Sequence, residues 1–159
     1  MKDLSPIKRH KAIASFSKDH HFGLLLVWKI RQGLDKAVNA ERISNYVCYF
    51  FKEDLEKHFK NEEQLLFQKL PMDDVLRKQA EEDHKTIYKL VNSLDENKHD
   101  SDLLRQFANE LEKHIRFEER ELFNHLQTKI TPEDLEIIGK RFSNNGKAID
   151  EKWEDVFWK

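Results

Sequence analysis

The stretch His58–Leu70, HFKNEEQLLFQKL, returns from His114 to Leu126 as HIRFEERELFNHL. The two copies lie 56 residues apart and share six of thirteen positions: the histidine, two glutamates, two leucines and a phenylalanine. In each copy the first glutamate follows the histidine by four residues, which places both side chains on one face of a helix. The repeat therefore predicts two helices that each present a His and a Glu to the same side.

The apolar residues outside the repeat also recur at intervals of three and four, the pattern of amphipathic helices. Four long helices are expected over about 11–37, 41–69, 74–96 and 102–128. Thr131 and Pro132 predict the start of a short helix, and AIDEKWEDVFWK at 148–159 predicts another. The predicted fold is all-α: an up-down-up-down four-helix bundle, about 11–128, with two short C-terminal helices, about 132–158, packed on it.

Length and composition limit the protein class. A chain of 159 residues is expected to form a single domain, residues 1–159, and its 38% hydrophobic and 36% charged residues disfavour disorder. A net charge of -2 argues against a nucleic-acid partner. No apolar leader and no run of about 18 apolar residues is present, so we expect a cytoplasmic protein with no membrane partner. Sequence leaves the oligomeric state open.

The first and third predicted helices each carry a histidine on the apolar stripe. His20 falls between Phe16 and Leu24, and His84 lies one turn after Ala80. His20 and His21 adjoin, so only one of them points inward; helical phase favours His20 and leaves His21 as the alternative. The two halves then match, because each supplies a lone His on one helix and a His-Glu pair on the next.

Buried imidazoles and carboxylates cost several kcal/mol unless something compensates their charge and lost hydration. Two metal ions would do so, because imidazole and bridging carboxylate suit iron and manganese, and helical bundles house dinuclear carboxylate sites. A network in which these groups only neutralise one another is the alternative. The candidate metal ligands are His20, His58, Glu62, His84, His114 and Glu118.

Three further residues of this region have two interpretations each. Tyr88 is either a core residue or a phenol near the metals that donates a hydrogen bond to a ligand bound there. Glu63 and Glu119 follow the candidate ligands by one residue and so leave the ligand face of the helix. We expect them to make surface ion pairs or hydrogen bonds to the ligands.

As a set, these residues resemble the hemerythrin-like (HHE cation-binding) proteins over nearly the whole chain. The resemblance implies two iron ions, oxo- or hydroxo-bridged, with Glu62 and Glu118 as bridges and the four histidines as caps; zinc and manganese are alternatives. Oxygen-carrying hemerythrins have a second His where this chain has Tyr88, and an Asp where it has Glu119. The four-His, two-Glu set is therefore more similar to bacterial HHE domains and to the repair-of-iron-centres proteins.

The resemblance also implies a class of function. We expect a non-haem di-iron protein that binds O2 or NO, for sensing, detoxification or iron handling. One alternative is a di-iron enzyme acting on peroxide or NO. The other is a metal-storage or structural bundle, holding iron or zinc, without gas chemistry. Whether the protein is an enzyme stays open at this point.

Overall fold

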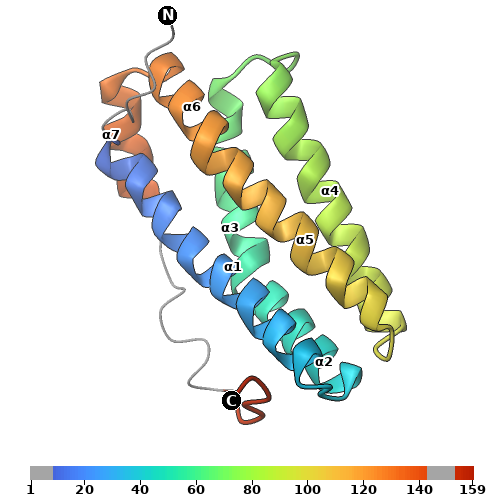
Figure 1. The fold of residues 1–159 in the computed structure, drawn as a ribbon. Coiled ribbons are helices and arrows are strands. Elements are labelled where there is room, and N and C mark those ends of the chain that lie inside the picture. Colours follow the sequence, from blue (N-terminus) through green and yellow to red (C-terminus); the bar gives the residue numbers. More distant parts are fainter. Residues whose placement is uncertain (1–8, 143–152) are drawn as a thin grey trace, which may run out of the picture.

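The computed structural model describes residues 9–142 and 153–159, and its main body is four long antiparallel helical rods (Figure 1). The first rod is α1 (Lys11–Asp35) and the third is α4 (Val75–Glu96). The second rod runs through α2 (Ala40–Phe50), η1 (Phe51–Leu55), α3 (Glu56–Asn61), η2 (Glu62–Leu66) and η3 (Phe67–Lys69). The fourth runs through α5 (Ser101–Phe117), η4 (Glu118–Leu122) and α6 (Phe123–Lys129). The segments η1, η2 and η4 are π-helical, and η3 is a 3-10 turn.

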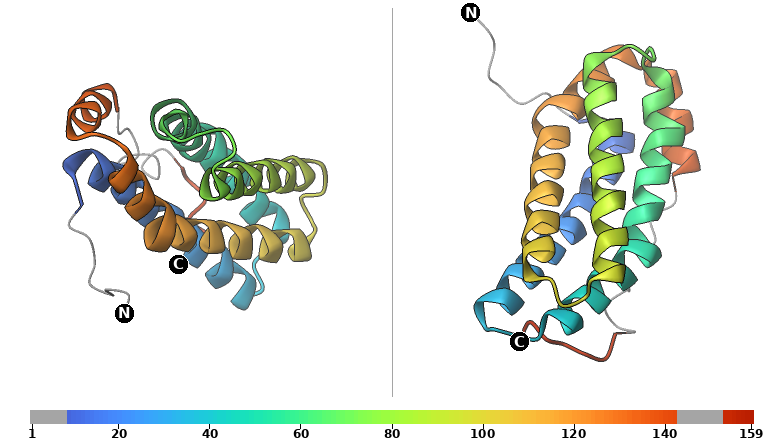
Figure 2. Two further views of the ribbon diagram at one scale, coloured as in Figure 1. Left: turned by 90° about the horizontal axis from the view of Figure 1, so that it is seen from above. Right: turned by 90° about the vertical axis from the view of Figure 1, so that its right-hand side faces the viewer.

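The four rods pack as the sequence predicts. α1 contacts α5, α5 contacts α4, and α4 contacts α2, so neighbours around the bundle run in opposite directions (Figure 2). Loops between the rods are short, which favours antiparallel neighbours. The predicted all-α, up-down-up-down bundle is confirmed. Among the described residues, no helix is long and apolar enough to cross a membrane.

The helix starts are fixed by side-chain caps. Asn39 accepts a hydrogen bond from the Glu41 backbone, and Asp100 accepts from the backbone N–H of Asp102 and Leu103. Thr131 caps the short helix α7 (Pro132–Arg141), which packs on α1. These side chains satisfy backbone N–H groups that have no partner within the helix. The predicted start of the first C-terminal helix is thus confirmed.

The second predicted C-terminal helix begins in 143–152, outside the described residues. Residues 153–159 are not helical and contain one turn, at Phe157 and Trp158 (Figure 1). A segment this short gains few helical hydrogen bonds, so tertiary contacts decide its shape. Its aromatic rings pack around Tyr46, with ring centroids 5.5 Å away for Trp153, 5.7 Å for Phe157 and 5.0 Å for Trp158. The segment covers one end of the bundle, as its apolar residues predicted.

Two hydrophobic clusters fill the bundle and leave a polar layer between them. One cluster holds residues such as Leu26, Ile87 and Leu111, and the other holds residues such as Phe16 and Leu122. Along every rod the chain passes from one cluster to the other through buried polar residues. The layer they form consists of Asp19, His20, His58, Glu62, Asp83, His84, His114 and Glu118.

Candidate metal centre

The polar layer contains all six residues that the sequence singles out, two or fewer from each rod. Their ligand atoms form two groups, and within each group all of these atoms lie within 4.8 Å of one another. Glu62 and Glu118 belong to both groups. The first group adds the histidines of α1 and α3, and the second adds those of α4 and α5. The first group consists of His20, His58, Glu62 and Glu118. The second consists of Glu62, His84, His114 and Glu118.

Each shared glutamate lies between one histidine of each group. The Nε2 atoms of His20 and His114 are 2.9 and 3.3 Å from Glu118 Oε1, and those of His84 and His58 are 3.2 and 3.5 Å from Glu62 Oε1 and Oε2. Two Nε2 atoms, those of His84 and His114, also face each other at 3.2 Å. A carboxylate that reaches two sets of imidazole nitrogens has the position of a bridge between two metal ions.

Several ligand atoms of this layer are buried and, among the described residues, have no hydrogen-bond partner. Glu62 and Glu118 are 0% exposed. Both oxygens of Glu62, Oε2 of Glu118 and Nε2 of His58 make no hydrogen bond within the described part of the chain. Burying such atoms unpaired costs several kcal/mol, and a metal ion bound to them would offset that cost. The residues present therefore fit the ligand set of two metal ions.

A second ring of carboxylates contacts the Nδ1 atoms on the far side of the histidines. Each carboxylate comes from a neighbouring rod, which ties the rods together at this level. A hydrogen bond at Nδ1 fixes the tautomer and leaves Nε2 free to face inward as a ligand. Three histidines make this hydrogen bond, with Nδ1–carboxylate distances of 3.0 Å for His58–Asp19, 3.0 Å for His114–Asp83 and 2.6 Å for His84–Glu63. His20 Nδ1 lies 3.3 Å from Glu119 Oε2 but makes no hydrogen bond within the described part of the chain.

The comparison with protein families agrees with this arrangement. A family model described as the hemerythrin HHE cation-binding domain matches residues 11–126. The chain belongs to this family. Searches of curated proteins and of solved structures found no match to the chain. Membership in a cation-binding family, together with the two His/Glu groups, indicates metal binding within the helical bundle.

Two of the π-helical segments of this hemerythrin-family bundle, η2 and η4, start at the shared glutamates. The backbone N–H of Phe67 donates to the Glu62 carbonyl, and that of Phe123 donates to the Glu118 carbonyl, one residue further than in an α-helix. Such insertions occur frequently at functional sites. They bring the repeated phenylalanines over the histidines: Phe67 lies 5.4 Å from His84 and Phe123 lies 5.2 Å from His20, between ring centroids.

The alternatives left open by the sequence separate in the structure. His20 lies in the polar layer, whereas His21 is exposed, so helical phase identified the inward residue. Tyr88 packs on Phe51 and Phe59, with ring centroids 5.0 and 6.1 Å away. Burial raises the pKa of the Tyr88 phenol to about 12. These contacts favour the core interpretation of Tyr88.

The outer carboxylates were only partly predicted. Glu63 and Glu119 both contact histidines, and Glu119 also forms an ion pair with Arg9, so both interpretations hold for Glu119. Asp19 and Asp83 were not assigned a role, although a signal was present: each directly precedes the lone histidine of its helix. Because each aspartate reaches a histidine of another rod, only the packing of the rods reveals its partner.

Electrostatics link the imidazoles and the buried carboxylates. Burial lowers the pKa of His114, but Glu118 and Asp83 outweigh it and raise this pKa to about 10. The same balance raises the pKa of His58 well above its ordinary value, mainly through Glu62 and Asp19. Burial raises the pKa of Glu118, yet the histidines around it bring the net value well below its ordinary range. A divalent cation would therefore compete with protons for the Nε2 atoms.

Two hollows approach this layer from different sides. A small enclosed cavity of about 10 Å³ touches the layer itself at His20, His58, His114 and Glu118. Its remaining wall is mostly apolar and includes Gly23, Leu55, Phe59, Leu111 and Ile115, with Asp19 and Asp54. This volume is about that of one water-sized molecule.

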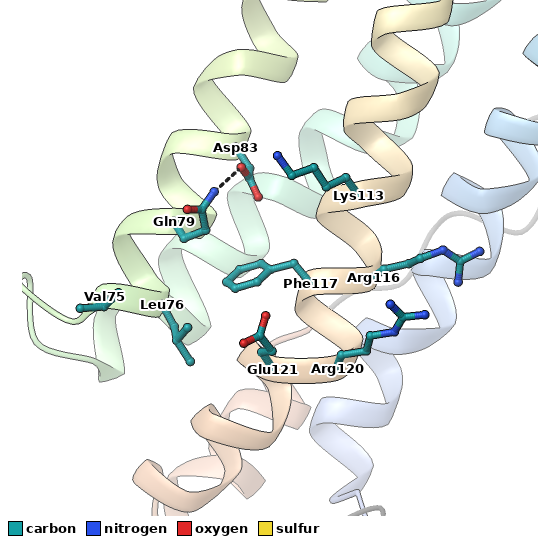
Figure 3. Close-up of a pocket in the computed structure, with 9 residues that line it drawn as sticks. All are labelled: Val75, Leu76, Gln79, Asp83, Lys113, Arg116, Phe117, Arg120 and Glu121. Carbon is teal, nitrogen blue, oxygen red and sulfur yellow. Dashed lines mark hydrogen bonds between the residues drawn. The ribbon is translucent and has the colours of Figure 1, made fainter.

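The larger hollow is an open groove of about 550 Å³ between α4 and the fourth rod (Figure 3). The side chains of Lys113 and Phe117 point across it toward α4, whereas those of Arg116 and Arg120 point away from α4. The groove reaches Asp83, whose carboxylate holds His114, but none of the six candidate ligands lines it. Of the two hollows, the small cavity is therefore the one that candidate ligands line.

Proposed function

We propose that the protein holds two iron ions in the polar layer and binds a small diatomic ligand, O2 or NO, in the cavity beside them. The observation that carries the proposal is the pair of ligand groups sharing Glu62 and Glu118, with an enclosed cavity that touches histidines of both groups. Glu62 and Glu118 would bridge the ions. The four histidines would cap them, two at each ion.

The protein's own residues would limit what reaches the ions. Ferrous iron bound here would supply an open coordination position and the electrons that a diatomic ligand accepts. Leu111, Ile115 and Phe59 form an apolar wall that disfavours water and charged molecules in the cavity. Its volume, about that of one water-sized molecule, admits only a very small ligand and excludes an organic substrate. These features favour gas binding over chemistry on larger molecules.

Tyr88 is not needed for the proposed ligand site. Its ring contacts Phe59, and Phe59 in turn stacks on His84 at 3.9 Å between centroids. The Phe59 ring thus lies next to both Tyr88 and His84. Oxygen-carrying hemerythrins have a further histidine ligand at the position of Tyr88, whereas Tyr88 packs in the core here. The ligand set then stays at four His and two Glu, the pattern of the bacterial and repair-of-iron-centres type.

The test is the metal content of the chain after anaerobic iron loading, followed by visible spectra on adding O2 or NO. We expect two irons per wild-type chain, and loss of iron in His58→Ala and His114→Ala. His99→Ala is the matched control, because His99 is exposed and, among the described residues, pairs only with Glu41 at 3.3 Å. A new charge-transfer band on exposure to gas would support the proposal.

Other outcomes separate the remaining functions. Two irons with no spectral change on adding either gas would indicate metal storage or a structural role. Repeated consumption of peroxide or NO by the loaded protein would indicate an enzyme. Wild-type protein that takes up little iron, while both histidine variants fold normally, would contradict metal binding and leave a polar network.

A further inference from the structure

The two histidines of α1 and α4 have outer carboxylates in unlike surroundings. Glu63 Oε2 lies 2.6 Å from His84 Nδ1. Within residues 9–142 and 153–159, no second ion pair or hydrogen bond of the Glu63 side chain is found, and this side chain is 39% exposed. The negative charge of Glu63 is therefore directed at a single imidazole.

Glu119, the carboxylate nearest to His20 Nδ1, accepts hydrogen bonds from two other side chains and none from His20. Arg9 Nη1 and Ser17 Oγ both donate to Oε2, each at 2.7 Å, while His20 Nδ1 lies 3.3 Å from the same oxygen. Arg9 Nη2 also donates to the Glu119 backbone carbonyl at 2.5 Å. The guanidinium lies 5.6 Å from the centroid of the Phe123 ring, which stacks on His20.

The remaining pair of outer carboxylates does not create this difference. Asp19 and Asp83 both lie 3.0 Å from the Nδ1 atoms of their histidines. Gln79 donates to Asp83 at 2.8 Å, but a neutral amide leaves the carboxylate its charge. Among the described residues, only Arg9 brings a full positive charge into the outer ring, because the other donors to these carboxylates are neutral groups or the histidines themselves.

An outer carboxylate raises the basicity of the imidazole it accepts from, and thereby strengthens the metal bond at the opposite nitrogen. Arg9 cancels much of the Glu119 charge, and the longer contact with His20 weakens the effect further. The guanidinium also repels a divalent cation placed just beyond His20, in a partly buried region where screening by water is incomplete. His84 should therefore bind a metal ion through Nε2 more strongly than His20 does.

We propose that Arg9 makes the two metal positions unequal, so that the position of His84 and His114 binds a divalent cation first and more tightly. The position of His20 and His58 then fills second and releases its ion first. This inference rests on the proposed metal binding and adds the order in which the two metal positions fill. Arg9 acts through Glu119 and His20, as a positioning residue.

The test is an anaerobic titration of the full chain with Co²⁺ against a competing chelator, followed by visible absorption. Wild type should show two binding steps. His84→Ala should lose the tighter step and His20→Ala the weaker one. Arg9→Met, which keeps an aliphatic side chain against Phe123, should tighten the weaker step by about tenfold and leave the tighter step unchanged.

Three further variants complete the test. Arg31→Met is the matched control, because Arg31 is likewise an arginine bonded to the fourth rod, through Asn109 at 2.9 Å and Glu112 at 3.2 Å, yet contacts no candidate ligand. It should change neither step. Glu63→Gln should weaken the tighter step. Ser17→Ala should move the weaker step in the same direction as Arg9→Met, and decides the question if Arg9→Met does not fold.

The failures are distinguishable. Two equal steps in wild type, or a weaker step that is unchanged or weakened in Arg9→Met and Ser17→Ala, would overturn the proposed inequality and leave metal binding intact. Wild-type protein that takes up no Co²⁺ would overturn metal binding, and the order of filling with it.

Discussion

At the scale of single residues, Gly23 gives the narrowest test of gas binding. A Cβ at this position would lie 2.7 Å from Ile115 Cδ1, at the wall of the small cavity. In Gly23→Ala we expect the Ile115 side chain to shift and reduce the space beside His20. Binding of O2 or NO to the iron-loaded protein should weaken, while iron content stays at two per chain. Equilibrium gas titration with parallel iron analysis measures both.

The contact partner supplies the control for this variant. Ile115→Val removes the Cδ1 atom that the added Cβ would meet, and lowers stability by about 1 kcal/mol. The double variant should therefore recover most of the gas affinity lost in Gly23→Ala. Unchanged gas affinity in the single variant would show that the cavity is not the ligand site.

Asp83 tests the outer carboxylates at the same scale. Its Oδ2 lies 3.0 Å from His114 Nδ1, and Asn in its place would keep the size but lose the charge. Loss of such an outer partner lowers metal affinity by about 10- to 100-fold. We expect that loss in Asp83→Asn, measured by chelator competition. Glu82→Gln, an exposed neighbour on the same helix, should bind metal as wild type does.

At the scale of elements, Asp74 caps helix α4, and the stability that this cap gives depends on pH. Its Oδ1 accepts from the Arg77 backbone at the start of α4, and its Oδ2 lies 2.7 Å from His125 Nε2. Burial raises the pKa of Asp74, but these hydrogen bonds outweigh it and lower the net value. Because the pKa of Asp74 is lower in the folded than in the unfolded protein, the charged carboxylate stabilises the fold. This contribution is complete above the pKa of the unfolded chain, about 3.9, and is lost as pH falls through the lower pKa of the folded protein.

Asp74→Ala should accordingly lower the free energy of unfolding by about 1 kcal/mol at pH 7, the usual cost of losing an N-cap. Urea unfolding of the metal-free protein at pH 7 and pH 3 measures the difference from wild type. It should shrink at pH 3, where the wild-type carboxylate starts to protonate. A difference that is constant over this range would contradict the assigned role of the charge.

The elements also show what sequence pattern can and cannot predict. Helical periodicity and the Thr131–Pro132 start predicted the rods and α7, because caps and apolar stripes are local features. The insertions at Glu62 and Glu118 were not predicted, since the spacing of apolar residues does not distinguish a single π-helical turn from an α-helical one. The aromatic residues at 153–159 indicated burial but not conformation, because contacts with Tyr46 outweigh helical preference there.

At the scale of the whole molecule, the polar layer joins all four rods at one level. Within each group the shared glutamates and the two histidines come from three different rods, and each outer carboxylate crosses to another rod again. The layer interrupts the hydrophobic core, so its buried charges oppose folding when they lack a cation. Metal binding should therefore stabilise the bundle as a unit rather than one helix.

This argument predicts a rise in the melting temperature on metal loading. At a free metal concentration 100 times the dissociation constant, one site adds about 2.7 kcal/mol to the free energy of unfolding. For a chain of this size, 1 kcal/mol shifts the melting temperature by about 2–4 °C, so one filled site gives a rise of about 5–10 °C. Thermal unfolding with and without Co²⁺ measures it, and His58→Ala/His114→Ala is the control. Equal melting temperatures for loaded and metal-free wild type would show that the layer does not bind metal in the folded bundle.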